Sequence, residues 1–175
     1  NDINFKSHAV GVSELSAYNY LRKDCVPIGS VEYVTTWLRL MGVGSIRPLN
    51  IPKELWKYCD RKIKIDYCKN INGHWMLKDI DEIKSANNGD VWFNGDGRSD
   101  KKFFLSQWVD DIKSEWRVFV LNNQIRNIQC YSGDCFTQPN KKYIELIASE
   151  YDKKCYTLDV LVDGKNHTEI IELHD

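Results

Sequence analysis

Residues 114–120 read Ser-Glu-Trp-Arg-Val-Phe-Val, and this run alternates in the way that a β-strand does. The three residues of its apolar face are Trp116, Val118 and Val120. The opposite face carries Glu115 and Arg117. An Asn-Asn pair at 122–123 follows, and asparagine tolerates the positive φ angles of a tight hairpin turn, so a second strand over 124–131 is predicted to run back. This hairpin places Glu115 and Arg117 on one face, either as a functional pair or as two solvated charges.

The 175 residues are 42% hydrophobic and carry a formal net charge of −1. This length suits one domain, with or without a small lobe, and the hydrophobic content is sufficient for a packed core. A net charge so close to zero gives no electrostatic basis for binding nucleic acid or a membrane surface, and no apolar run is of spanning length. We therefore expect neither partner. Because the sequence begins with Asn1 and not methionine, we also expect that it lacks its natural start.

The cysteines occur without a Cys-x-x-Cys pair, at positions 25, 59, 68, 130, 135 and 155. Six cysteines would make three disulfides in a secreted chain. Because no signal peptide is recognisable, we expect a cytoplasmic protein with free, mostly buried thiols. The spacing of the cysteines and histidines does not suit a structural zinc site.

Three segments have the pattern of helices. Ser30 is a suitable N-cap for a helix over 31–41, in which apolar residues recur at helical spacing before Gly42. Pro52 can open a short helix over 53–59. A third helix is predicted over 140–151, where an apolar stripe would pack against a sheet.

Strands are predicted over 74–78, which ends in a lysine, and over the apolar segment 103–109. We expect one antiparallel sheet that combines 103–109 with 115–131 and 155–173. The helix over 140–151 is expected to cover this sheet.

The end of the chain alternates again on both sides of an Asp-Gly turn at 163–164. If Val162 faces Glu169 across this turn, then Asp159 lies directly opposite Glu172, with Cβ atoms about 4.5–5.5 Å apart. Two carboxylates so placed repel one another unless a cation or a proton intervenes, and oxygen ligands at this separation suit Mg²⁺ held together with substrate phosphates. The alternative is a pair of solvated acids. Asp159 interrupts an otherwise apolar strand, which favours a site.

The order of these features resembles the nucleotide-binding core of the ATP-grasp superfamily. The order is a lysine-ended strand, an apolar strand, the Glu-Trp-Arg hairpin, a helix, Leu-Asp-Val and Ile-Glu-Leu. More narrowly, it is similar to a compact clade, common in phage and bacterial genomes, that is named for an arginine and two lysines. The segment Pro-Ile-Gly-Ser-Val-Glu-Tyr-Val at 27–34 resembles the N-terminal signature of that clade, so the resemblance covers about 26–175.

The resemblance implies an α+β fold with an ATP-grasp-like antiparallel sheet, packed helices and a reduced N-terminal lobe. It implies a single domain over 1–175. Within that domain, about 1–60 would form a helical lobe and about 61–175 the nucleotide-binding core.

The resemblance also implies a role for each matching position. Lys78 would contact the nucleotide phosphates, and Lys84 would be the second lysine, in the loop that covers them. Arg117 would neutralise charge on the transferred phosphoryl group, so Arg117 and Lys78 are the implied catalytic residues. Asp159 and Glu172 match the two metal-binding carboxylates. The backbone of the hinge would read adenine, and the hinge consists of Ser106, Gln107, Trp108 and Val109.

Two positions depart from the pattern of the family. Asp79 follows Lys78, where the family usually has proline. His174 stands two residues after the metal-binding glutamate, where the family usually has asparagine. His174 could still bind metal or phosphate, although Mg²⁺ prefers oxygen to imidazole.

The function that the resemblance implies is an ATP-dependent carboxylate–amine or carboxylate–thiol ligase that works through an acyl phosphate. ATP and Mg²⁺ would be its cofactors, and its partner would be a carboxylate substrate, with a peptide or protein among the candidates. Two alternatives stay open: a nucleotide-binding regulatory domain that has lost catalysis, and a non-enzymatic interaction module.

Overall fold

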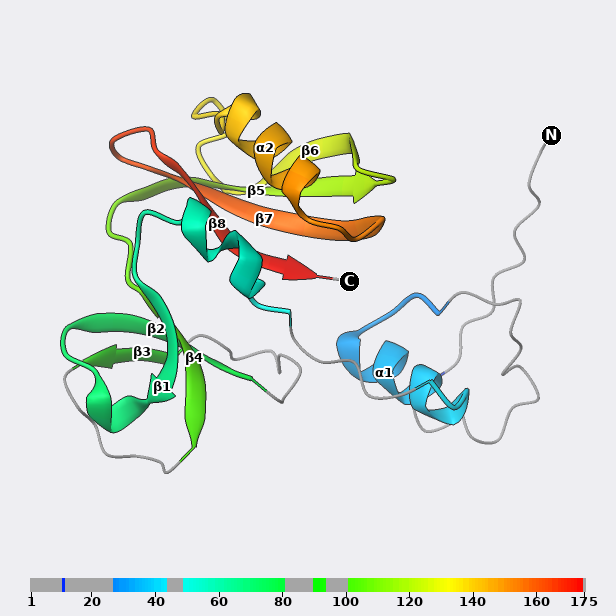
Figure 1. The fold of residues 1–175 in the computed structure, drawn as a ribbon. Helices are drawn as coiled ribbons and strands as arrows, with labels where there is room; N and C mark the ends of the chain where they lie inside the picture. The colour runs from blue at the N-terminus through cyan, green and yellow to red at the C-terminus, as the bar shows by residue number, and fades with distance from the viewer. Residues whose placement is uncertain (1–10, 12–26, 44–48, 81–89, 94–100, 175) are drawn as a thin grey trace. The chain divides into compact units, whose positions relative to one another are not determined.

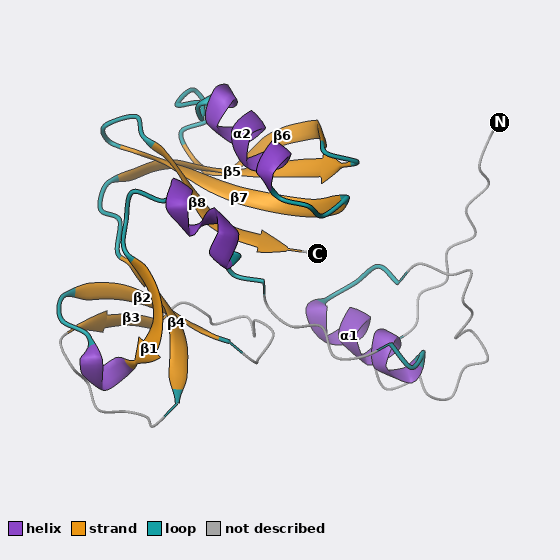
Figure 2. Ribbon diagram, viewed as in Figure 1, coloured by secondary structure: helices purple, strands orange, loops and turns teal. Residues whose placement is uncertain are grey.

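The computed structural model describes residue 11 and residues 27–43, 49–80, 90–93 and 101–174. The chain divides into two compact units, one of residues 1–47 with 83–86 and one of residues 48–82 with 87–175. Among the described residues, the first unit contains helix α1, and the second contains two four-stranded antiparallel sheets with their helices (Figure 1, Figure 2). The expected α+β class, with antiparallel sheets and packed helices, is confirmed.

Helix α1 spans Val31–Leu40, as predicted. Its N-terminus is capped by Ser30, whose Oγ accepts a hydrogen bond of 3.2 Å from the N–H of Tyr33. The helix ends before Gly42, which adopts a φ of 73° that suits glycine.

The first sheet has the strand order β1-β4-β2-β3. Its strands are β1 (Ile63–Tyr67), β2 (His74–Asp79), β3 (Asp90–Phe93) and β4 (Lys102–Gln107). A short 3-10 helix, η3 (Cys68–Asn70), lies between β1 and β2 in the chain. One side of this sheet has a small core of its own, formed by Cys68, Ile71, Trp75, Leu77 and Leu105.

The second sheet has the order β6-β5-β7-β8 and contains the predicted hairpin. Its strands are β5 (Ile112–Leu121), β6 (Gln124–Gly133), β7 (Cys155–Asp163) and β8 (Thr168–His174). Asn122 and Asn123 form the turn between β5 and β6 with φ angles of 52° and 57°, the left-handed values that a tight hairpin needs. Trp116, Val118 and Val120 are buried on one face, which confirms the predicted alternation.

Helix α2 (Lys141–Glu150) packs on the second sheet, as its apolar stripe predicted. Asn140 caps its N-terminus by accepting a hydrogen bond of 3.3 Å from the N–H of Tyr143. Ile144 and Ile147 are fully buried in the main core. The 3-10 helix η2 (Lys53–Tyr58) follows Pro52, as expected for a short helix there, and adds Leu55 to the same core.

The strand predicted over 103–109 forms as β4, but the expectation that it joins the same sheet as the hairpin is wrong. β4 is a central strand of the first sheet, paired with β1 and β2. Its two faces serve different cores, because Phe104 lies in the main core and Leu105 in the small one. A strand buried on both sides has a continuous apolar sequence, and such a sequence does not indicate its partners.

The five described cysteines are free thiols, as expected. The expectation that they are mostly buried is wrong, since Cys68 alone among them is fully buried and Cys135 and Cys155 are exposed. The exposed pair lies in the loop after β6 and at the start of β7. In the part of the chain that the structure describes, no helix has the length and apolar character needed to cross a membrane.

Candidate functional site

Asp159 on β7 and Glu172 on β8 lie directly opposite one another, as predicted. The predicted route to this pairing is wrong near the turn, because Val162 pairs with Thr168 and not with Glu169. A register shift between Asp159 and Val160 accounts for the difference, since Val160 pairs with Ile170 and leaves Ile171 as an extra residue of β8. The bulge restores the pairing of the two acids. Both carboxylates are buried, Asp159 with 2% and Glu172 with 5% of its surface exposed.

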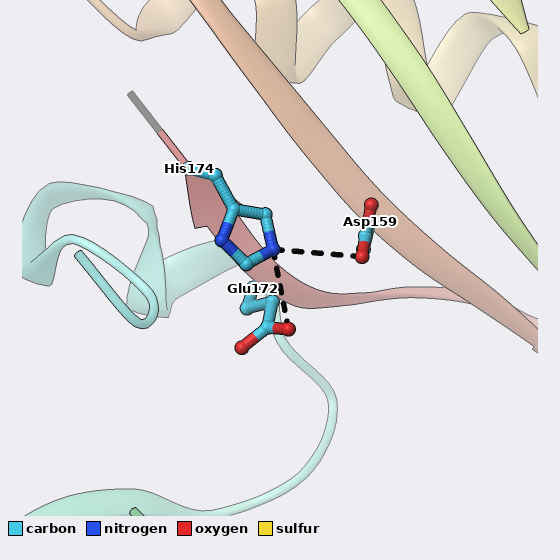
Figure 3. Close-up of side chains that lie close together, drawn as sticks. All are labelled: Asp159, Glu172 and His174. Carbon is cyan, nitrogen blue, oxygen red and sulfur yellow. Dashed lines mark ion pairs between the residues drawn. The ribbon is translucent and has the colours of Figure 1, made fainter. Parts of the chain in front are cut away.

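His174 completes a cluster with the two acids (Figure 3). It lies two residues after Glu172 on β8, so its side chain is on the same face of the strand. Its Nε2 atom is 3.2 Å from Oε1 of Glu172 and 3.6 Å from Oδ2 of Asp159. One potential ligand atom from each of the three residues falls within a group no more than 4.8 Å across.

Arg117 binds Asp159 through both ends of its guanidinium fork. Nε donates to Oδ1 at 2.8 Å and Nη2 donates to Oδ2 at 2.7 Å, a bidentate arrangement that adds directional specificity to charge attraction. The two residues are directly opposed on β5 and β7. The ring of Tyr131, on β6, lies 5.5 Å from the guanidinium carbon, within cation–π distance. Arg117 is therefore held from two sides while 43% of its side chain stays exposed.

Lys78 reaches the same cluster from the first sheet. Its Nζ forms a buried ion pair with Oε2 of Glu172, and the two side chains are 11% and 7% exposed. Lys78 lies near the end of β2, the strand end predicted to carry a phosphate-binding lysine. The two sheets of the second unit thus place Lys78 and Arg117 on the same pair of acids.

These contacts change the titration of the cluster. Burial acts to raise the pKa of Asp159, but hydrogen bonding and charge attraction from Arg117, together with the nearby His174, outweigh burial and lower it. Asp159, and then Glu172, raises the pKa of His174 to about 9. At neutral pH, three positive side chains therefore surround two carboxylates, so the two acids do not confront each other uncompensated as the sequence alone suggested.

The remaining predicted site residues are partly within the described structure. Lys84 lies outside the described residues, so its approach to the phosphates stays a prediction. Gln107 ends β4, and its N–H donates to the carbonyl of Lys62 at 2.9 Å. The N–H of Trp108 donates to the carbonyl of His74 at 3.0 Å. Both amides serve the sheet, so Val109 becomes the hinge residue whose N–H we would assign to adenine.

Two features of the site carry no signal that the sequence reasoning used. Tyr131 sits under Arg117 because a register shift between Glu115 and Trp116 alters the pairing of β6, and bulges are not visible in an alternation pattern. Arg61 links the sheets beside the site, donating to Oε2 of Glu169 and to the carbonyl of Ile170, each at 2.5 Å. The partners lie 108 and 109 residues apart in the chain.

The three clustered side chains fit a divalent cation. Two ligands at right angles on a small dication with bonds of about 2.1 Å are about 3 Å apart, close to the 3.2 Å between His174 and Glu172. Nε2 of His174 is buried yet has no aligned hydrogen-bond partner among the described residues, an unsatisfied atom that a cation would engage. Asp159, Glu172 and His174 are the residues that would hold the ion.

Residues 62–175 match the model of an ATP-grasp domain family, the second family of the clade named for an arginine and two lysines. No protein of curated function matches the chain. Among solved structures, the chain is similar to a RimK domain protein ATP-grasp from Sphaerobacter thermophilus, with 12% identity and a TM-score of 0.50 over 70% of this chain and 55% of that one. It is also similar to an L-amino acid ligase from Bacillus licheniformis, with 8% identity and a TM-score of 0.47 over 81% of this chain and 45% of the other. The chain thus spans about half the length of these two proteins.

Proposed function

Because the chain belongs to this ATP-grasp domain family, we propose that it is an ATP- and metal-dependent ligase that activates a carboxylate. The observation that carries this proposal is the convergence of Lys78 and Arg117, from two different sheets, on the Asp159–Glu172 pair. Phosphoryl transfer depends on positioning and charge neutralisation more than on covalent catalysis, and this cluster offers both.

In the proposed reaction, a carboxylate oxygen of the substrate attacks the γ-phosphorus of ATP. The bond from that phosphorus to the β–γ bridging oxygen breaks, ADP leaves, and an acyl phosphate forms. An amine or thiol then attacks the acyl carbon and releases inorganic phosphate, with one proton lost from the nucleophile. A dication at the site would supply neutralisation of the phosphate charge. The acyl donor and acceptor, including a peptide or protein, stay predictions of the family resemblance, as does the cytoplasmic location.

We assign the protein residues to roles that follow from their contacts. Lys78 and Arg117 each bind one of the two acids, so they are stored beside the place where a nucleotide's phosphates would lie. When the nucleotide arrives with its metal ion, these two cations would exchange carboxylate for phosphate partners. Arg117 would face the transferred phosphoryl group with its planar fork, and Tyr131 would support the guanidinium during this exchange.

The nucleotide would be held by further residues of the second unit. Its adenine would contact the hinge formed by Gln107, Trp108 and Val109, and Lys84 would cover the phosphates. Asp159 and Glu172 would hold the dication, with His174 as the third ligand.

A second candidate function is nucleotide sensing without ligation. The replacement of the usual asparagine by His174, and of the usual proline by Asp79, favours it, because both departures lie beside the proposed phosphate and metal ligands. The fold and the cluster of charges would then retain the binding role alone.

Release of ADP from ATP tests the proposal, measured with pools of amino acids, small carboxylates and short peptides. We expect turnover that depends on an added acceptor and that Glu172→Gln abolishes, while Glu145→Gln, an exposed substitution on α2, leaves it intact. Binding of ATP without any turnover would support the sensing role. Absence of ATP binding would support a non-enzymatic interaction module and contradict both nucleotide proposals.

A further inference from the structure

His174 presents a nitrogen donor to the two acids, and this donor is particular to the site described above. Nε2 is buried and lies 3.2 Å from Oε1 of Glu172, while Lys78 contacts the other oxygen, Oε2. The ring points at both acids from the strand that carries Glu172 (Figure 3). A dication bound by the acids would therefore meet one imidazole nitrogen and two carboxylate groups.

This donor set is a poor match for magnesium. Mg²⁺ prefers oxygen ligands and retains several waters, whereas an imidazole ligand favours first-row transition ions. For sites with nitrogen and oxygen donors, affinity rises along that series from Mn²⁺, which is its weakest member. The chemistry of His174 thus opposes the usual choice of Mg²⁺ at this position.

We propose that the Asp159–Glu172–His174 cluster binds a first-row transition-metal dication in preference to Mg²⁺, with Nε2 of His174 as a direct ligand. The inference rests on the proposed function, because it concerns the identity of the ion that accompanies the nucleotide at the same acids. His174 is the specificity-determining residue, and it replaces the oxygen donor that an asparagine would offer.

The alternative role of His174 is that of a counter-cation that only neutralises the acids. The two roles differ in one observable, the bond between the nitrogen and the ion. A ligand couples magnetically to a bound paramagnetic ion, whereas a displaced imidazolium does not. Mn²⁺ is therefore the appropriate probe, and as the weakest binder of its series it is also the most stringent one.

The test compares the wild type, His174→Asn and His167→Asn in the presence of a non-hydrolysable ATP analogue. His167 is a suitable control because it lies in the turn between β7 and β8 with 59% of its side chain exposed, beside Asp163. Bound Mn²⁺ is measured by electron paramagnetic resonance, Mg²⁺ is added as a competitor, and pulsed spectra report coupling to imidazole nitrogen.

We expect a nitrogen coupling in the wild type and in His167→Asn that is absent from His174→Asn. Loss of a mere outer-shell partner commonly weakens metal binding about 10- to 100-fold, so losing this ligand should shift the Mn²⁺-to-Mg²⁺ affinity ratio toward Mg²⁺ by at least about ten-fold. ATP turnover by His174→Asn should be equal or higher with Mg²⁺ and lower with Mn²⁺.

Two results overturn the inference and leave the proposed function intact: bound Mn²⁺ without coupling to a histidine nitrogen, or an affinity ratio unchanged in His174→Asn. The first is read in the wild type, so it does not depend on the folding of a variant. A coupling that persists in His174→Asn would come from adenine and would also overturn the inference. If nucleotide binds to none of the three proteins with either ion, the proposed function fails as well.

Discussion

Arg117 shows how one side chain joins the structure of the site to its chemistry. Its fork engages both oxygens of a carboxylate that is 2% exposed, and its ion pair raises the pKa of the guanidinium. An ammonium is a point charge, so it cannot reproduce two parallel donors to one planar acceptor. The same geometry suits the oxygens of a phosphoryl group.

We predict that Arg117→Lys weakens binding of metal-bound nucleotide by about ten-fold or more, because a hydrogen bond to a charged partner contributes about 1.5–3 kcal/mol. Arg126→Lys is the matched control, since Arg126 is an exposed residue of β6. Calorimetric titration with a non-hydrolysable ATP analogue measures both. An affinity of Arg117→Lys equal to that of the wild type would remove Arg117 from the phosphate site.

Cys59 should be the slowest-titrating of the thiols near the core. Burial, more than any charge, raises its pKa to about 11, whereas Cys135 and Cys155 are exposed. The thiolate is the reactive form, so alkylation of Cys59 should accelerate about ten-fold per pH unit between about pH 8 and 10. Peptide-level mass spectrometry after short exposure to iodoacetamide follows each site. Rapid labelling of Cys59 at the lower pH, comparable to that of Cys135, would contradict the packing around it.

At the scale of elements, the site depends on how two sheets are joined. Arg61 precedes β1, donates from Nε to Oγ of Ser106 in β4 at 2.5 Å, and pairs with Glu169 in β8. Arg61 and Glu169 are 8% and 9% exposed, so the pair is buried. This contact fixes β8, the strand that carries Glu172, against the sheet that carries Lys78.

Arg61→Met should lower the free energy of unfolding by about 3–5 kcal/mol, because it leaves a buried carboxylate unpaired. The double variant Arg61→Met with Glu169→Met should lose less than Arg61→Met alone, since no charge stays buried. Urea denaturation measures both. Lys57→Met, in an exposed pair with Glu150, is the control and should stay near the wild type. A single variant as stable as this control would show that Arg61 does not join the sheets.

Local patterns predicted the elements well and the long-range pairings only in part. The hairpin of β5 and β6 and the helix α2 follow from alternation, an Asn-Asn turn and an apolar stripe. The opposition of Asp159 and Glu172 was also predicted, although it depends on an extra residue at Ile171 that compensates for a shorter turn. The sheet to which β4 belongs, and the pairing of Arg61 with Glu169, depend on contacts between distant segments. No local periodicity encodes such contacts.

At the scale of the whole molecule, the central claim is that a nucleotide and a dication bind together at the Asp159–Glu172 pair. Either alone would leave charges unmatched, because Lys78 and Arg117 now neutralise the acids. A ligand that binds the folded state at about 100 times its dissociation constant adds about 2.7 kcal/mol of stability. For a chain of this size, that corresponds to a rise of roughly 5–10 °C in the melting temperature.

The most direct test is the melting temperature of the protein with a non-hydrolysable ATP analogue, measured with Mg²⁺, with Mn²⁺ and with a chelator. We predict a rise of several degrees that requires a dication, that is absent in Glu172→Gln and that persists in Glu145→Gln, whose side chain is exposed on α2. Glutamine preserves the volume of Glu172, so loss of the response would reflect loss of the ligand and not of the fold. An equal rise in the presence of the chelator, or a full rise in Glu172→Gln, would contradict the account.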